Sequence, residues 1–304
     1  MSSSASSASA ALPFGRLTTA MITPFHADGS LDLEATQKLA TLLVDQGNDG
    51  LVINGTTGEA PTTTDPEQLR IVRAVVEAVG DRAKIVVGVG TNNTAHSVEC
   101  AKAAEAAGAD GLLVVTPYYN KPPQEGIKLH FTTIADATGL PVMAYDIPSR
   151  AGVPITTETM LALAEHPRIV AVKDAKGDIA GTTKVLANSD LFYYCGADEL
   201  NLPWLAMGAV GLVSVVSHLA SPQYRQLIDA VVAGDLATAQ RIDRQLVPAV
   251  EAIMMRTQGA IVVKAALKLT GVIEHATVRS PLVEATGEQV DWLTTDLKTA
   301  GLIA

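Results

Sequence analysis

The sequence has only two cysteines, Cys100 and Cys195, which are far apart in the chain and lack the spacing of a metal-binding pair. Its six histidines include no pair with the spacing His-x-x-x-His. We therefore expect no structural metal. A chain so poor in cysteine suits a reducing cytoplasm, where we expect the protein to reside.

Positive charge is scarce as well, since 22 Lys and Arg residues stand against 32 Asp and Glu residues and leave a net charge of −10. No cluster of Lys and Arg forms a stripe that would neutralise nucleic acid phosphates. Phosphate-binding loops are also missing: "NGTTGEAP" at residues 54–61 has no Gly-Lys-Ser/Thr, and "GVGTNN" at residues 88–93 lacks the third glycine of a dinucleotide fingerprint. These absences argue against nucleic acid as a partner and against a cofactor bound through its phosphates.

Long apolar runs are absent too, and no uninterrupted stretch reaches the roughly 18 residues of a transmembrane helix. The N-terminal "MSSSASSASAALPFG" has neither the positive region nor the apolar core of a secretory signal. We expect residues 1–11 to form a disordered tail and the chain to be neither exported nor anchored in a membrane.

The sequence is rich in short Val and Ile runs that alternate with longer Ala and Leu segments of helical period. With 304 residues and 48% hydrophobic content, the chain is long enough to bury a sizeable core. Eight strands interleaved with helices predict a closed parallel (β/α)8 TIM barrel. The expected strands are 17–23, 50–54, 84–90, 111–116, 141–146, 169–173, 192–196 and 211–216.

Helical segments are expected between these strands. One of them is expected to be capped by Asp65, with Pro66 in the first helical position and Gly80 at its end. After about residue 221 only helices are expected. We therefore predict a catalytic barrel at 12–235 and a small C-terminal helical domain at 236–304. The expected helices begin near Asp32, Asp65, Thr94, Gln124, Thr156, Ile179 and Leu200, followed by 222–233, 235–256, 260–270 and 288–301.

Chemistry in such a barrel is expected where the strands end, and "IVAVK" ends on Lys173. This lysine either extends outward beside Asp174 or points into the barrel mouth. In the second case burial lowers the pKa of the amine, and the free amine becomes a nucleophile toward carbonyl groups. Lys176, in the following loop, is a weaker candidate.

Other strand ends carry polar side chains that suit either packing or substrate binding. Tyr145 ends "PVMAY", and Arg150 follows a proline that is expected to prevent a regular helix. An arginine there forms a structural ion pair or grips a substrate carboxylate through two hydrogen bonds. Thr56 and Thr57 stand between glycines, in an ordinary turn or on a pocket floor lined by hydroxyl groups. Tyr119 and its neighbour Tyr118 suit a packed loop or an interface.

Taken in order along the chain, "NGTTGEAP", "TPYYNKPPQEG", "YDIPSRAG" and "VAVKDAKG" resemble the dihydrodipicolinate synthase family of pyruvate-dependent class I aldolases. The similarity covers nearly the whole chain after the Ser/Ala tail. It implies that Lys173 forms a Schiff base with the substrate. It also implies that Tyr145, Thr56 and Tyr119 relay protons, with Tyr119 supplied by a neighbouring subunit.

The same resemblance implies a set of substrate-binding residues. Thr57 would hold the pyruvate carboxylate, Arg150 the carboxylate of the second substrate, and Gly196 and Val213 would line the pocket. The expected reaction joins pyruvate to aspartate 4-semialdehyde and gives 4-hydroxytetrahydrodipicolinate, an intermediate toward diaminopimelate and lysine, without a metal or an organic cofactor. The expected assembly is a homotetramer built from two tight dimers.

Two alternatives stay open at the level of the sequence. One is another pyruvate-dependent aldolase, such as N-acetylneuraminate lyase or a 2-keto-3-deoxy sugar acid aldolase. The other is a non-catalytic barrel that binds a keto acid. The chain also departs from lysine-inhibited relatives, because His96 and Asp65 stand where those carry a glutamate and a histidine. We therefore predict weak or absent inhibition by lysine.

Overall fold

The computed structural model describes residues 12–304, and the predicted disordered tail at 1–11 lies outside the described residues. Eight strands, all parallel, follow one another in chain order and close into a barrel, because β8 pairs with β1. The predicted (β/α)8 barrel is therefore confirmed, and each strand ends within three residues of its predicted bounds. The strands are β1 (Leu17–Ala20), β2 (Gly50–Ile53), β3 (Lys84–Gly88), β4 (Gly111–Val115), β5 (Val142–Asp146), β6 (Ile169–Asp174), β7 (Phe192–Cys195) and β8 (Gly211–Ser214).

The strands are buried along most of their length, as parallel strands covered by helices should be. The closing seam is tight at Gly211, where an added Cβ would lie only 2.2 Å from the carbonyl oxygen of Arg16. Leu17 pairs with Leu212 across this seam. A residue without a side chain at the start of β8 therefore lets the last strand reach the first.

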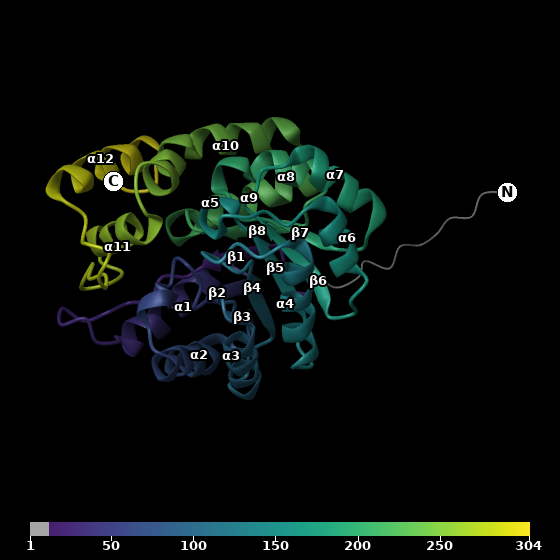
Figure 1. Ribbon diagram of the computed structural model, residues 1–304. Coiled ribbons are helices and arrows are strands. Elements are labelled where there is room, and N and C mark those ends of the chain that lie inside the picture. The colour runs from purple at the N-terminus through teal and green to yellow at the C-terminus, as the bar shows by residue number, and fades with distance from the viewer. Residues whose placement is uncertain (1–11) are drawn as a thin grey trace.

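Helices follow most strands and cover the barrel, with α1, α2 and α3 beside β1 to β4 and α4, α6 and α7 farther along (Figure 1). Among residues 12–304, no helix has both the length and the apolar character that a membrane span requires. The barrel helices are α1 (Leu33–Asp45), α2 (Asp65–Val79), α3 (Thr94–Ala106), α4 (Gln124–Asp136), α5 (Pro148–Ala151), α6 (Thr157–Ala164), α7 (Ile179–Asn188), α8 (Asn201–Met207) and α9 (Ser217–Val232).

Three local predictions were wrong. The cap of α2 is Thr64, whose backbone N–H and hydroxyl donate hydrogen bonds to the Glu67 carboxylate at 2.9 and 3.1 Å, so that Asp65 is already helical. Pro148 does not prevent a helix but opens the single turn of α5, because proline suits the first helical position. Helix α9 begins five residues before its predicted start at 222, since a turn with a kink at Ala220 (φ −125°) precedes Pro222.

The C-terminal part is helical, as predicted. It contains α10 (Leu236–Val250), a π-helical turn at Glu251–Met255, α11 (Gly259–Leu269) and α12 (Gly287–Thr299). Figure 1 shows these helices in green and yellow beside α8 and α9, and α10 contacts both of those barrel helices. Asp235 caps α10, which is where we propose that the C-terminal helical domain begins.

Candidate active site

Lys173 lies near the carboxyl end of β6 and is only 5% exposed. Its Nζ atom is 4.3 Å from the centre of the Tyr145 ring. The two residues are neighbours because β5 and β6 pair in a register that sets Tyr145 directly opposite Lys173. The alternative in which this lysine extends into solvent is therefore wrong, and its amine is buried beside an aromatic face.

Burial lowers the pKa of Lys173 to about 8, because the charged form loses more hydration than the neutral amine. The negative charge of Asp198 opposes this shift, whereas the positive charge of Arg150 adds to it. An amine with this pKa is partly neutral near pH 7, and the neutral form is the one that attacks a carbonyl carbon.

Tyr145 has a perturbed pKa as well. Burial raises the pKa of its phenol to about 12, while the positive charge of Arg150 and the Thr56 hydroxyl both act to lower it. Since Arg150 lowers the pKa of both Lys173 and Tyr145, its guanidinium lies within electrostatic reach of the two reactive groups. Arg150 is itself exposed, on the short helix α5. The site thus combines a buried amine, a protonated phenol and an accessible cation.

Gly196, directly after β7, leaves the room that the Lys173 side chain occupies. A Cβ at Gly196 would lie 2.7 Å from Cγ and 2.8 Å from Cε of Lys173. The Gly196 backbone is held in place by a 2.7 Å hydrogen bond from its N–H to the carbonyl oxygen of Asp174. A side chain at this position therefore has to displace the lysine.

Asp198 was not singled out by the sequence, although it follows β7 in the stretch "GADE". Its carboxylate is 4% exposed and accepts hydrogen bonds from the backbone N–H groups of Val215 (2.8 Å) and Val216 (3.1 Å) and from the Asn201 amide (3.0 Å). These donors compensate the buried negative charge, which in turn raises the pKa of Lys173. The sequence signal that could have identified Asp198 was its position as an acidic residue just after a strand end.

Thr56 and Thr57 lie in the turn after β2, half-buried and buried respectively. The turn is anchored at Glu59, which has a left-handed backbone (φ 56°). The Glu59 carboxylate accepts hydrogen bonds from the Lys264 ammonium on α11 at 2.5 Å and from the backbone N–H of Arg279 at 2.9 Å. Both members of the Glu59–Lys264 pair are almost fully buried. Contacts from α11 and from the segment between α11 and α12 therefore hold the threonine turn, and no sequence motif indicated them.

Lys176 is not among the groups that mainly shift the pKa of Lys173. Its ammonium donates a hydrogen bond to the carbonyl oxygen of Ile155 at 2.9 Å and lies 3.5 Å from the carboxylate of Asp146 and 3.7 Å from that of Asp178. These contacts hold the amine of Lys176, the weaker candidate for the nucleophile, in hydrogen bonds and ion pairs. Lys176 instead ties the loop after β6 to its neighbours.

Two of the predicted residues are not gathered with the others. Tyr119 is 89% exposed in the loop after β4 and has a left-handed backbone (φ 72°), while Tyr118 beside it is half-buried. Val213 is fully buried in β8, with β7 between its strand and that of Lys173. Within one chain the structure therefore brings together Lys173, Tyr145 and Gly196. Arg150 acts on the pKa of Lys173 and Tyr145, Thr56 acts on that of Tyr145, and Thr57 is buried beside Thr56 in the same turn.

A closed parallel barrel with a buried lysine amine at its mouth is the architecture of a class I aldolase, a lyase-type enzyme that activates a carbonyl substrate through its own lysine. More particularly, the chain belongs to the dihydrodipicolinate synthetase family, whose model matches residues 13–300.

Individual relatives agree with this assignment. The chain is 61% identical to 4-hydroxy-tetrahydrodipicolinate synthase of Kineococcus radiotolerans, over 95% of this chain and 94% of the relative. It is 60% identical to 4-hydroxy-tetrahydrodipicolinate synthase 2 of Streptomyces coelicolor, over 95% of this chain and 96% of that one. Among solved structures, the enzyme of Cyanidioschyzon merolae with lysine bound is 38% identical and superimposes with a TM-score of 0.93, covering 96% of this chain and 99% of that chain.

Proposed function

We propose that the protein condenses pyruvate with aspartate 4-semialdehyde to give 4-hydroxytetrahydrodipicolinate, through a Schiff base on Lys173. One observation carries the proposal: the Lys173 amine is buried over the Tyr145 ring, and burial lowers its pKa to about 8. A lysine in such surroundings is prepared for attack on a keto acid. The names of the relatives supply the product, 4-hydroxy-tetrahydrodipicolinate.

The first half of the reaction activates pyruvate. The neutral Lys173 amine attacks C2 of pyruvate, the resulting carbinolamine loses water, and a cationic imine forms. This imine accepts electrons, so a proton leaves the methyl carbon and an enamine results. Tyr145, whose hydroxyl stays protonated because its pKa is about 12, donates the proton that water needs to depart and recovers one afterwards.

The second half forms the carbon–carbon bond. The enamine carbon attacks the aldehyde carbon of aspartate 4-semialdehyde, and the aldehyde oxygen takes up a proton to become a hydroxyl. The amine of the same substrate then attacks the imine carbon, closes the ring and displaces Lys173 as a free amine. The lysine performs the carbonyl activation, so we propose that the reaction needs no metal and no organic cofactor.

Protons travel, in this proposal, along a relay from Tyr145 through Thr56 to Tyr119 of a neighbouring subunit. Two observations support it. The Thr56 hydroxyl acts on the pKa of Tyr145, and Tyr119 is displayed to the outside of its own chain at 89% exposure. A relay of hydroxyl groups moves a proton without isolating a phenolate, which a phenol with a raised pKa forms poorly at neutral pH.

Substrate binding is assigned by the same proposal. Thr57 holds the pyruvate carboxylate, the exposed cation of Arg150 holds the carboxylate of the second substrate, and Gly196 and Val213 line the pocket. Arg150 suits this task because it is exposed, its charge acts on both Lys173 and Tyr145, and a guanidinium can bind a carboxylate through two parallel hydrogen bonds. Such a grip fits a short amino acid aldehyde better than a polyhydroxylated sugar acid.

Borohydride reduction in the presence of pyruvate tests the proposal. We expect one trapped adduct per chain, mapped by peptide mass to Lys173, and none in Lys173→Ala. Lys176→Ala is the matched control, because its lysine lies in the adjacent loop and should leave the adduct in place. A wild-type chain without an adduct refutes the Schiff-base mechanism. Adduct formation combined with cleavage of sugar acids, and no use of aspartate 4-semialdehyde, would favour a different aldolase of the superfamily.

The assembly and the setting follow from the proposed chemistry. Since Tyr119 acts across an interface, at least a dimer is required, and we propose a homotetramer of two tight dimers acting in the cytoplasm. The mass of the full-length protein in solution measures this assembly directly.

We also propose that lysine inhibits weakly or not at all, because the carboxylate of Asp65 is hydrogen-bonded to His96 at 3.0 Å and position 96 has no carboxylate to receive the amine of lysine. Strong inhibition at sub-millimolar lysine refutes that statement.

A further inference from the structure

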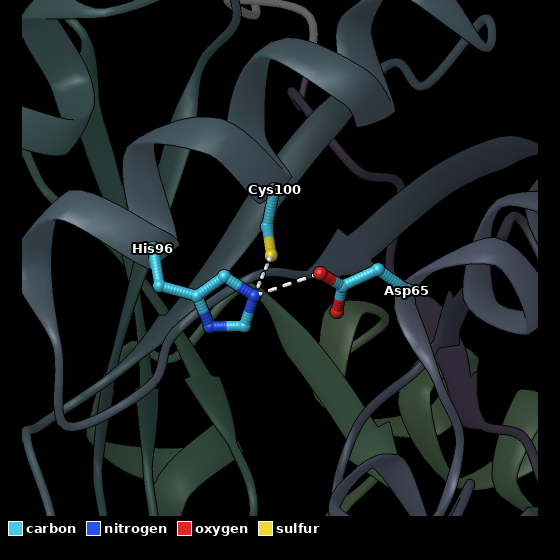
Figure 2. Close-up of side chains that lie close together, drawn as sticks. All are labelled: Asp65, His96 and Cys100. Carbon is cyan, nitrogen blue, oxygen red and sulfur yellow. Dashed lines mark hydrogen bonds and ion pairs between the residues drawn. The ribbon is translucent and has the colours of Figure 1, made fainter.

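Three side chains with metal-binding atoms meet where α2 and α3 begin, after the carboxyl ends of β2 and β3. Asp65 opens α2, and His96 and Cys100 lie four residues apart on α3, which sets them on the same face of that helix. Nε2 of His96 is 3.0 Å from Oδ2 of Asp65 and 3.5 Å from Sγ of Cys100. Figure 2 shows the imidazole between the carboxylate and the thiol, and all three donor atoms lie within 4.8 Å of one another.

These separations match the edges of a tetrahedral metal site. With zinc bonds of about 2.3 Å to sulfur and about 2.1 Å to nitrogen and oxygen, a tetrahedron has edges of about 3.6 Å from sulfur to nitrogen and about 3.4 Å from nitrogen to oxygen. The corresponding distances here are 3.5 Å and 3.0 Å. Two of the three edges therefore lie within a few tenths of an ångström of tetrahedral values, and the edge from sulfur to oxygen, which is within 4.8 Å, shortens when the three atoms share one ion.

The charges around the cluster favour a cation. Asp65 and Glu99 line the same cavity as Cys100 and place two carboxylates near its thiol. A divalent ion neutralises this negative surrounding and takes the place of the thiol proton, which is released to solvent when the thiolate binds. Ions can reach the cluster, since the side chains of His96 and Asp65 are 38% and 63% exposed.

A cavity of about 170 Å³ adjoins the cluster and supplies the second observation. Asp65 and Cys100 line it together with Glu99, aliphatic side chains and Asn54. Asn54 is 4% exposed, and its Oδ1 atom has no hydrogen-bond partner within residues 12–304. The cavity has room for several water molecules, and a buried amide oxygen without a partner is a site at which water is retained.

We propose that Asp65, His96 and Cys100 bind a divalent transition metal of the zinc type, with water from the adjoining cavity as the fourth ligand. A carboxylate, an imidazole and a thiolate form a donor set that such an ion accepts, whereas magnesium and calcium prefer oxygen ligands alone. The ion links the first turn of α2 to the first turns of α3. The sequence predicted no metal because only His-x-x-x-His and paired cysteines were considered, and His96-x-x-x-Cys100 has the same one-turn spacing.

Cobalt(II) titration of the full-length protein, stripped of metal by a chelator, tests the site. Cobalt replaces zinc in tetrahedral sites and reports a bound thiolate by a charge-transfer band in the near ultraviolet. We expect the band to saturate at one cobalt per chain and to disappear on addition of zinc. Cys100→Ser should abolish the band, and His96→Ala and Asp65→Asn should weaken cobalt binding by more than about tenfold. Circular dichroism establishes that each variant is folded.

His166→Ala is the matched control. His166 lies 3.1 Å from the carboxylate of Asp136, much like the His96–Asp65 pair, and no cysteine belongs to that pair. We expect this variant to bind cobalt as the unchanged protein does. The proposal is refuted if the unchanged protein shows no charge-transfer band, or if Cys100→Ser keeps the band. It is equally refuted if His166→Ala weakens binding as much as His96→Ala does, since the ion would then be held non-specifically.

Discussion

The close approach of Gly196 to Lys173 leads to a prediction for Gly196→Ala. The new Cβ would lie 2.7 Å and 2.8 Å from two carbons of the lysine and 3.1 Å from the carbonyl oxygen of Asp174. Carbon atoms in contact prefer separations of about 3.5 Å or more. The hydrogen bond from the Gly196 N–H to Asp174 restrains the backbone, so the lysine side chain has to yield by about 0.7–1 Å.

A displacement of this size is expected to slow the reaction strongly and to disturb the fold little. Misplacing a reacting group by about 1 Å costs up to about 100-fold in rate, and a tenfold loss corresponds to about 1.4 kcal/mol of activation free energy. We therefore expect the rate constant for imine formation between pyruvate and Lys173 to fall by about 10- to 100-fold. The lysine stays buried, so the variant should still fold.

The measurement is the rate of borohydride trapping with pyruvate, taken in parallel with thermal unfolding. Gly287→Ala is the matched control, because a Cβ at Gly287 meets no atom within 4 Å and the residue lies at the start of α12. A trapping rate in Gly196→Ala equal to that of the Gly287 variant would show that Gly196 does not provide the space for the lysine.

Three further predictions concern charge and the proton relay. The trapping rate should rise with pH, because loss of the proton from Lys173, with its pKa of about 8, produces the nucleophile. We expect an increase of about fivefold from pH 7 to 8 and of about twofold or less from pH 8 to 9. A flat pH profile contradicts this prediction. Lys264→Met leaves the buried carboxylate of Glu59 without its ammonium, so the free energy of unfolding in urea should fall by about 3–5 kcal/mol. Lys38→Met, in an exposed ion pair, should lower it by only about 0.5 kcal/mol. Equal losses argue against a buried anchor. Tyr119→Phe should lower turnover by about tenfold or more without changing the melting temperature, and unchanged turnover argues against the relay.

Much of the barrel was predictable because its signals are local. A parallel strand buried on both faces requires a run of apolar residues, and "IVAVK" shows this together with the one residue that breaks it, Lys173. The position of that lysine at a strand end, and hence near the barrel mouth, followed from the strand alone. Errors occurred where two local signals compete. Thr64 and Asp65 are both good caps, and a proline such as Pro148 can either end a helix or begin one.

The amino-acid sequence by itself therefore determined the barrel, the order of its elements and the candidate nucleophile, because hydrophobic period and turn residues act over a few neighbours. Three other features depended on the closed barrel and the helices packed upon it. These are the inward direction of Lys173, the buried charge that Asp198 supplies beside it, and the anchoring of the threonine turn by Lys264 through Glu59. These contacts join residues from 25 to 205 positions apart. Only the folded chain brings such groups within a few ångströms, where desolvation and Coulomb interactions become strong enough to change their chemistry.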